Sequence, residues 1–257
     1  MENLNNIEKT LKYYELLMVR NLNDIKNCEL PSGFKFVFWD SDDCLNDWIN
    51  IHTETGEFCS LNEANEIFHQ FYDGFYDQLS KRCLFVVDKN NVKVATATIS
   101  PANEYGYDCV IDWFAVSPKA QGLKLSKPLL YKTLQTAKDL GYNKILLHTQ
   151  THTWLAAKIY LVCGFEPFMT TDNLGWDILK TITNHPALKN FKTLKKQDLF
   201  DALIVKIKQK LDTLHSNYTY SVWYINGRND VFVKEGNKYF KYLFKLNNNT
   251  ITLEKVE

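Results

Sequence analysis

The chain has 257 residues, of which 45% are hydrophobic, so it can bury one good core and a small second one. No apolar run approaches the roughly 18 residues of a membrane-spanning helix, and the polar amino-terminal residues do not resemble a signal peptide. The six cysteines are scattered without C-x-x-C pairs, which argues against a metal site or a disulfide framework. We therefore expect a cytoplasmic protein with reduced cysteines, no metal and no membrane contact.

Charge divides the chain into two parts. Residues 1–188 carry 17 Lys and Arg against 23 Asp and Glu, whereas residues 189–257 carry 13 against 7. The segment Thr-Asn-His-Pro before Ala187 supplies a break between them. We predict a helical lead-in over residues 1–30, a main domain over 31–186 and a small basic domain over 187–257.

The first elements follow from apolar spacing and capping residues. Residues 1–20 have apolar side chains at helical spacing and are predicted to form a helix. A strand over residues 34–38 precedes two helices, the first capped by Ser41 or Asp42 and the second by Ser60. Residues 84–100 are then predicted to form a hairpin of two strands around a turn-rich segment.

A buried strand that leads into an amphipathic helix is the central feature of the chain. Residues 109–116 are rich in β-formers, Ser117-Pro118 turns the chain, and the helix ends at Gly141. Between strand and helix, residues 121–126 bring together backbone N–H groups that have no partners within the helix. Such groups can converge on an anion.

This loop resembles the acyl-CoA pyrophosphate loop of the GCN5-related N-acetyltransferases (GNAT), whose pattern is V-x-P-x-x-[QR]-G-x-G-x-[GA]. Four residues carry the match: Val116, Pro118, Gln121 and Gly122. Lys124 and Ser126 depart from it, because the family usually has glycine or a small apolar residue there. A residue in helical conformation tolerates a side chain, so Lys124 is expected to be helical. It is then either a cation near phosphate or a solvated lysine.

A second stretch, TWLAAKIYLVCGF over residues 153–165, is similar to the next GNAT motif, N-x-x-A-x-x-L-Y-x-x-x-G-F. Five residues are in register: Ala156, Ile159, Tyr160, Gly164 and Phe165. Thr153 replaces the asparagine. The resemblance covers about residues 34–180 and implies an α+β fold with a mixed, mostly antiparallel sheet flanked by helices. On this resemblance we expect residues 31–186 to be a GNAT acetyltransferase domain.

The resemblance also implies how acetyl-CoA and an amine would react. Tyr160 is the implied general acid for the departing thiolate, although an isolated tyrosine on a helix is often a core residue. Asp112 lies two positions before Phe114, on the same strand face, and is the candidate base. A structural salt bridge or proton transfer through water would be the alternative. Cofactor contacts are expected at ten residues: Phe114, Ala115, Val116, Gln121, Gly122, Leu123, Lys124, Leu125, Ser126 and Thr153.

In the family, the two helices after the first strand form a wall of the acceptor groove. Four residues here are candidates for that wall: Glu54, Glu57, Tyr72 and Tyr76. The polar face and the core stripe of amphipathic helices account for the same residues without a function.

The carboxy-terminal segment belongs to no family that we recognise. Residues 194–215 have the spacing of a basic amphipathic helix, and polar turns such as Asn226-Gly227 separate β-rich runs. We predict a small helix packed on an antiparallel meander. Its lysines are spread over helix and strands, which favours solvated faces over nucleic-acid binding. A protein partner or a homodimer through this segment is left open.

Two functions are compatible with the sequence. The first is an acetyl-CoA-dependent N-acetyltransferase acting on an unidentified primary amine. The alternative is a catalytically degenerate GNAT-like module that binds acyl-CoA or another protein. The departures at Lys124, Ser126 and Thr153 support the alternative, whereas Tyr160 and Gln121 support the enzyme.

Overall fold

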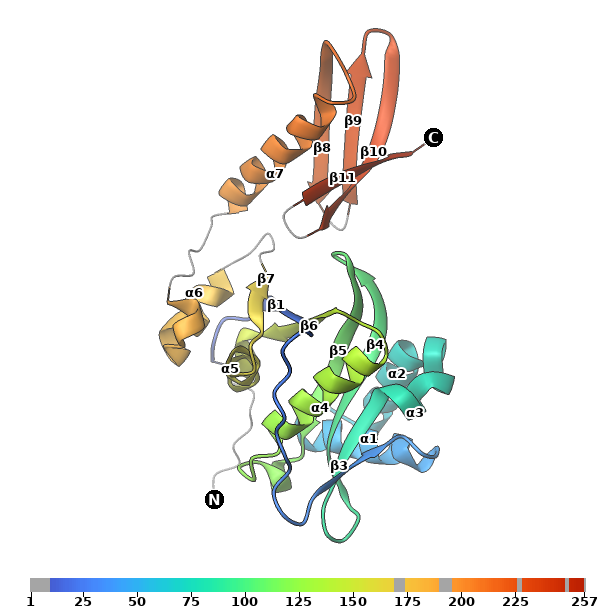
Figure 1. The fold of residues 1–257 in the computed structure, drawn as a ribbon, viewed down its shortest axis with the longest axis vertical. Helices are drawn as coiled ribbons and strands as arrows, with labels where there is room; N and C mark the ends of the chain where they lie inside the picture. Colours follow the sequence, from blue (N-terminus) through green and yellow to red (C-terminus); the bar gives the residue numbers. More distant parts are fainter. Residues whose placement is uncertain (1–9, 169–173, 190–195, 226–227, 248–249, 257) are drawn as a thin grey trace. The chain divides into compact units, whose positions relative to one another are not determined.

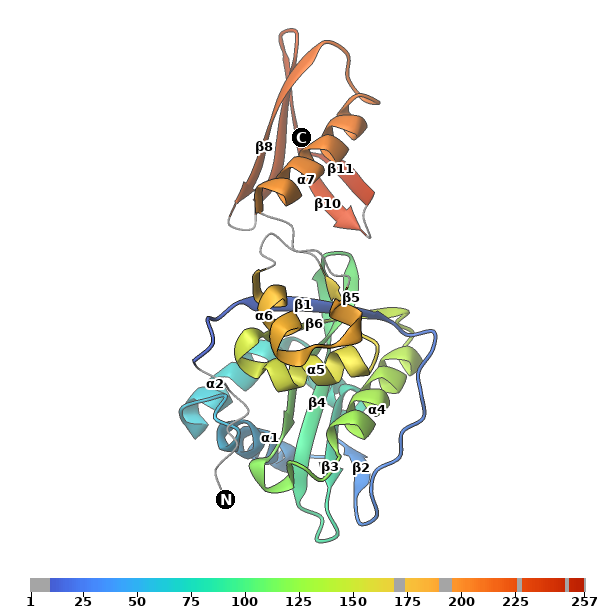
Figure 2. The same ribbon diagram turned by 90° about the vertical axis from the view of Figure 1, so that its left-hand side faces the viewer.

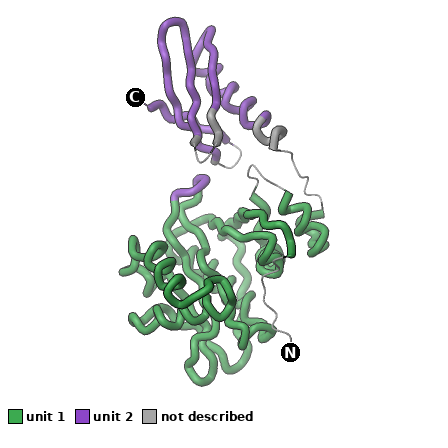
Figure 3. Tube along the Cα trace, turned by 180° about the vertical axis from the view of Figure 1, so that it is seen from behind, with its two compact units in different colours: residues 1–102, 107–169, 174–193 green, residues 103–106, 170–173, 194–257 purple. Residues whose placement is uncertain are grey.

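The computed structural model describes residues 10–168, 174–189, 196–225, 228–247 and 250–256. The chain divides into two compact units, one of residues 1–102, 107–169 and 174–193, the other of residues 103–106, 170–173 and 194–257 (Figure 3). The predicted domain boundaries stay predictions. Within the described ranges, none of the helices combines the length and apolar character that a membrane crossing requires.

A seven-stranded sheet in the order β2-β3-β4-β5-β6-β1-β7 is the framework of the first unit (Figure 1). Its strands are β1 (Glu15–Asn21), β2 (Lys35–Phe38), β3 (Cys83–Val87), β4 (Lys93–Glu104), β5 (Tyr107–Val116), β6 (Lys144–Gln150) and β7 (Glu166–Phe168). β5 and β6 are parallel, whereas β2–β3, β3–β4, β1–β6 and β1–β7 are antiparallel. The expected mixed, mostly antiparallel sheet with flanking helices is confirmed.

Helices cover both faces of this sheet. They are α1 (Asp43–Glu54), α2 (Leu61–Tyr72), α3 (Leu79–Arg82), α4 (Ser126–Asp139), α5 (Trp154–Val162) and α6 (Leu174–Thr183), with short 3-10 turns η1 (Asp73–Gln78), η2 (Pro118–Ala120), η3 (Thr151–Thr153) and η4 (Pro186–Leu188). The side chains of β3 alternate between two apolar clusters: Cys83 and Phe85 pack with α1 and α2, and Leu84 and Val86 pack with α4, α5 and α6. We call these the α1–α2 cluster and the α4–α6 cluster.

Both predicted helices after the first strand are confirmed, but the predicted cap of the first is wrong: Asp42 is the N-cap of α1 and makes no side-chain cap bond. α2 begins at Leu61, and the Ser60 hydroxyl caps it by accepting a hydrogen bond from the Glu63 backbone N–H at 3.1 Å. The Glu63 carboxylate in turn accepts from the Cys59 N–H at 2.7 Å. Reciprocal bonds of this kind satisfy backbone donors that a helix start would otherwise leave without partners.

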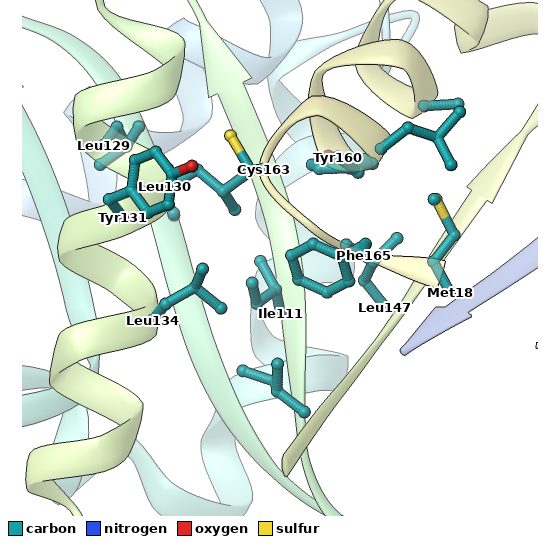
Figure 4. Packing of buried hydrophobic residues seen from close by; sticks show 14 of the residues in the cluster. Met18, Ile111, Leu129, Leu130, Tyr131, Leu134, Leu147, Tyr160, Cys163 and Phe165 are labelled. Carbon is teal, nitrogen blue, oxygen red and sulfur yellow. The ribbon is translucent and has the colours of Figure 1, made fainter. Parts of the chain in front are cut away.

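The predicted amino-terminal helix is wrong where the structure describes it, and residues 1–9 lie outside the described residues. Residues 15–21 form β1, which lies between β6 and β7 with Met18 opposite Leu147 (Figures 1 and 2). Leu16, Leu17 and Met18 are all buried, and Met18 packs near Phe165 (Figure 4). A consecutive apolar run gains more from burial on both faces of a sheet than from its helical spacing.

The second unit is a helix on a four-stranded antiparallel sheet. α7 (Lys196–Leu211) precedes β8 (Tyr218–Ile225), β9 (Arg228–Glu235), β10 (Lys238–Asn247) and β11 (Thr250–Val256), in the sheet order β11-β10-β9-β8. Leu203, Ile207 and Leu211 of the helix pack on the strands. The predicted helix and meander are confirmed, although the Asn226-Gly227 turn lies outside the described residues.

Candidate active site

The parallel strands β5 and β6 separate within the sheet. They pair at only two positions, Val110 with Leu146 and Ile111 with Leu147, although β5 runs on to Val116. Beyond Ile111, the β6-facing edge of β5 therefore has no neighbouring strand in the described part of the chain. Unpaired strand edges present backbone donors and acceptors that an extended ligand can use.

A break in the alternation of β5 decides which side chains lie on which face. Trp113 has a φ of +52°, in the left-handed region that bulky residues rarely adopt. Trp113 packs with the α1–α2 cluster and Phe114 with the α4–α6 cluster, while the charge of Asp112 acts on Tyr72 of α2. The expectation that Asp112 and Phe114 share a face is therefore wrong, because the left-handed residue between them reverses the alternation.

His52 of α1 packs beside Trp113, the left-handed residue of β5. Its side chain is buried, and its ring lies 5.8 Å from the Trp113 ring and 4.2 Å from the Trp48 ring between centroids. Burial lowers the pKa of His52 to about 3, so the imidazole is neutral at physiological pH. Its Nε2 is enclosed and has no hydrogen-bond partner among the described residues.

The turn after β5 is anchored at both ends. The Gln121 side chain donates to the Val116 carbonyl at 3.2 Å and so closes the loop on the strand. The Glu54 carboxylate accepts from Lys119 Nζ and from Ser117 Oγ, each at 2.7 Å. These two bonds, with that from Lys119 the larger, lower the pKa of Glu54. Glu54 therefore connects α1 to the loop.

Two residues of the loop are left-handed, Gly122 at φ +79° and Lys124 at φ +62°. The expectation that Lys124 is helical is wrong, because α4 begins only at Ser126. Lys124 thus keeps the backbone path that a glycine would favour. This conformation costs a non-glycine residue about 1–2 kcal/mol.

The start of α4 presents unpaired backbone donors. Leu125 is the N-cap without a side-chain cap bond, and the first turn holds no acidic residue. The amides of Lys124, Leu125 and Ser126 find no acceptor within the described ranges. Donors of this kind, at the positive end of the helix dipole, suit phosphate oxygens.

Tyr160 lies on α5 with its ring in the core. The ring is 6% exposed, 5.9 Å from the Phe114 ring and 5.8 Å from the Phe165 ring between centroids (Figure 4). Its hydroxyl has no hydrogen-bond partner among the described residues, yet it is not fully enclosed. Burial, and then the charge of Glu57, raise the pKa of Tyr160, so the hydroxyl keeps its proton at neutral pH.

Glu57 is a site residue that the sequence singled out only as a member of a helix wall. It lies in the loop between α1 and α2, and its charge raises the pKa of both Tyr160 and Tyr13. The Glu57 residue is exposed overall, but its carboxyl group is partly shielded from water, and this desolvation raises its pKa. No local pattern distinguishes such a carboxylate, because its effect on Tyr160 depends on residues about a hundred positions apart in the chain.

The other sequence candidates have separate surroundings. Thr153 turns its hydroxyl toward Thr149 Oγ1 at 3.2 Å and toward the Gln150 carbonyl at 3.3 Å. Tyr72 is fully buried and belongs to the core, whereas the Tyr76 hydroxyl donates to Asp42 at 2.6 Å. Within the described part of the chain no three His, Cys, Asp or Glu residues are grouped to hold a metal ion, and all six cysteines are free thiols.

Fold and site together define a mixed α+β domain in which a separated strand pair leads into a loop with unpaired backbone donors at a helix start. Residues 45–165 match the model of the acetyltransferase (GNAT) family, and this part of the chain is a GNAT domain. The region beyond it is unassigned. No curated protein sequence matches the chain.

Several solved structures resemble the chain at low identity. A GCN5-related N-acetyltransferase from Sphaerobacter thermophilus has a TM-score of 0.49 and 13% identity, over 60% of this chain and 48% of that one. A GNAT-family acetyltransferase from Colwellia psychrerythraea has a TM-score of 0.48 and 12% identity, over 61% and 54%. Spermidine N-acetyltransferase from Vibrio cholerae has a TM-score of 0.38 and 18% identity, over 52% and 80%. The match spans about half the length of the first two relatives.

Proposed function

We propose that this chain is an acetyl-CoA-dependent N-acetyltransferase that acylates a primary amine by direct attack on the thioester. The observation that supports it most is the separation of β5 from β6 beside a loop in which the amides of Lys124, Leu125 and Ser126 have no acceptor among the described residues. An extended pantetheine arm can pair with an open strand edge while its phosphates meet the start of a helix. Membership of the GNAT domain in an acetyltransferase family supports the same reaction.

The cofactor would lie along β5 and the loop that follows it. The backbone of Phe114, Ala115 and Val116 would hold the thioester, and its N–H groups would stabilise the developing oxyanion. The pyrophosphate would rest on the amides from Gln121 to Ser126, a stretch that includes Gly122, Leu123, Lys124 and Leu125. Thr153 would border the acyl end from the start of α5.

Two protons must move during the reaction. The amine has to lose a proton before it attacks, and the departing thiolate has to gain one. Tyr160 would supply the second, since burial keeps its hydroxyl protonated next to the Phe114 ring. Asp112 lies on the α1–α2 side of β5 and is the sequence-derived candidate for meeting the amine.

The test combines cofactor binding with one variant. Acetyl-CoA and free CoA, but not ATP, should raise the thermal midpoint of the wild-type chain. Saturation at about 100 times the dissociation constant adds ~2.7 kcal/mol of stability. Tyr160→Phe should lower kcat by about 10²–10⁴-fold and leave the acetyl-CoA dissociation constant unchanged. Tyr239→Phe, a change at a 74% exposed tyrosine of the second unit, is the matched control.

A binding module without catalysis is the second candidate, and Lys124 is the observation that favours it. A large side chain at a left-handed position of the loop is a departure from the family pattern that adds strain. Acetyl-CoA binding without acetylation of any amine, in both wild type and Tyr160→Phe, would support the module. Absence of a midpoint shift with acetyl-CoA would contradict the enzyme and favour a module that binds another protein.

A further inference from the structure

The loop between α1 and α2 brings a carboxylate to the end of β5. Glu57 is followed by Phe58, whose ring lies 5.0 Å from that of Trp113 between centroids. The next strand residue, Phe114, lies edge to face with Tyr160 at 5.9 Å. These contacts place the loop that carries Glu57 at the part of β5 beyond its pairing with β6, and the charge of Glu57 raises the pKa of Tyr160.

Glu57 has no compensating cation among the described residues. Desolvation is the sole cause of the raised pKa of its carboxyl, and no basic group acts against it. The neighbouring carboxylate Glu54 differs, because Lys119 and Ser117 satisfy it. A carboxylate that is crowded but uncompensated is stabilised by a bound ammonium group.

Aromatic rings line the α1–α2 side of β5, where Phe58, the residue after Glu57, packs on Trp113. The Phe71 and Trp113 rings meet edge to face at 5.2 Å, and Phe71 is 41% exposed. Behind them, Phe58 and His52 complete the ring cluster around Trp113, with a neutral imidazole. These rings favour an apolar or aromatic body next to a single ammonium, whereas the hydroxyl groups of a sugar and the second charged group of a polyamine would lose hydration there.

We propose that Glu57 binds the acceptor ammonium and takes its first proton, and that Phe71 and Trp113 receive an apolar, aromatic or alkyl body of the amine. The inference rests on the proposed acetyltransferase activity and names its acceptor class. The substrate is then a primary amine on a hydrophobic skeleton, as opposed to a polyamine or an amino sugar.

The proton transfers balance in this arrangement. The Glu57 carboxylate takes one proton from the ammonium, and the neutral nitrogen attacks the thioester carbonyl carbon to form the C–N bond. When the C–S bond breaks, the sulfur takes the proton of the Tyr160 hydroxyl. The second proton lost by the nitrogen restores Tyr160, and Glu57 releases its proton to water. The net products are the amide, free CoA and one proton.

The experiment uses the full chain, acetyl-CoA and four amines: 2-phenylethylamine, methylamine, spermidine and glucosamine. We expect kcat/KM for 2-phenylethylamine to exceed that for spermidine and glucosamine by at least about 10-fold. Glu57→Gln should lower kcat/KM by at least about 10²-fold without changing acetyl-CoA binding. Glu29→Gln, at an exposed position in the loop between β1 and β2, is its control, and Asp112→Asn tests the rival carboxylate.

A second variant tests the aromatic wall separately. Phe71→Ala should raise KM for 2-phenylethylamine by about 3–10-fold and leave that for methylamine unchanged. Leu61→Ala, at a 54% exposed position of the same helix, is its control. The midpoint shift with acetyl-CoA shows for each variant that the domain is folded.

The outcomes separate this inference from the proposed function. If the wild type does not bind acetyl-CoA, the proposed function fails and the inference fails with it. Suppose instead that the wild type binds acetyl-CoA and acetylates amines. Glu57→Gln can then keep the wild-type kcat/KM, or Asp112→Asn can be the only variant that loses activity. Either result overturns the role of Glu57 only. Preference for spermidine or glucosamine, or acetyl-CoA binding without acetylation of any of the four amines, overturns the acceptor class.

Discussion

Lys124→Gly should stabilise the first unit, although the change removes a side chain. Lys124 has a φ of +62°, which costs an L-residue about 1–2 kcal/mol relative to glycine. Glycine also increases the conformational freedom of the unfolded chain, which offsets about 0.4–1 kcal/mol of this gain. The expected net gain is therefore about 0.5–1 kcal/mol, which raises the thermal midpoint of a domain of this size by about 1–4 °C.

Thermal unfolding of the unliganded chain measures this gain, with Lys26→Gly as the matched control. Lys26 is an exposed loop lysine outside the left-handed region, so the same change there should lower stability by about 0.4–1 kcal/mol. Lys124→Asn separates strain from charge, because asparagine tolerates left-handed backbone and is neutral. If Lys124→Gly lowers the midpoint as Lys26→Gly does, the assignment of strain to this position is refuted.

Three further results are expected. Between pH 7 and pH 5 the first unit should lose about 2 kcal/mol of stability, because unfolded histidine binds a proton near pH 6.5 whereas buried His52, with a pKa of about 3, does not. Urea unfolding of His52→Gln should lack this loss, and equal losses would contradict it. Gly175→Ala should lower the free energy of unfolding by about 1–3 kcal/mol, and with it the thermal midpoint, because the new Cβ would lie 2.7 Å from Tyr14 Cβ. An unchanged midpoint would mean that this segment shifts freely. Bonding to His215 lowers the pKa of Glu235, so the ionised carboxylate stabilises β9. Hydrogen-exchange protection of β9 should therefore be complete above the ordinary pKa of glutamate and should fall as the pH drops through the lowered pKa of Glu235. Glu235→Gln should remove that dependence, and an unaltered pH profile would count against the pairing.

Local sequence patterns predicted much of the framework. The Ser60 cap, the strand over Lys35–Phe38 and the junction of β5 with α4 all depend on residues close together in the chain, so propensity and capping suffice to find them. The same holds for the helix and meander of the second unit. The order of the two family motifs identified the domain, and the family match over residues 45–165 agrees with it.

The amino-terminal segment and Lys124 could not be predicted in this way. Residues 1–20 do have apolar side chains at helical spacing, but residues 15–21 pair with β6 and β7 and form a strand between them. Only contacts more than a hundred residues apart in the chain decide between the two structures. Lys124 was expected to be helical because lysine disfavours positive φ, yet the loop path imposes it.

By itself the sequence determined the class of domain, and it supplied the proposed cofactor loop and the candidate acid Tyr160, since these depend on residue identity at short spacing. The tertiary structure decided which carboxylate approaches that tyrosine. Asp112 faces α2, the positive φ at Trp113 puts Phe114 on the opposite face, and it is the charge of Glu57, in the loop between α1 and α2, that acts on Tyr160. Strand alternation predicts faces only while every residue keeps an extended backbone, and a single left-handed residue reverses the prediction.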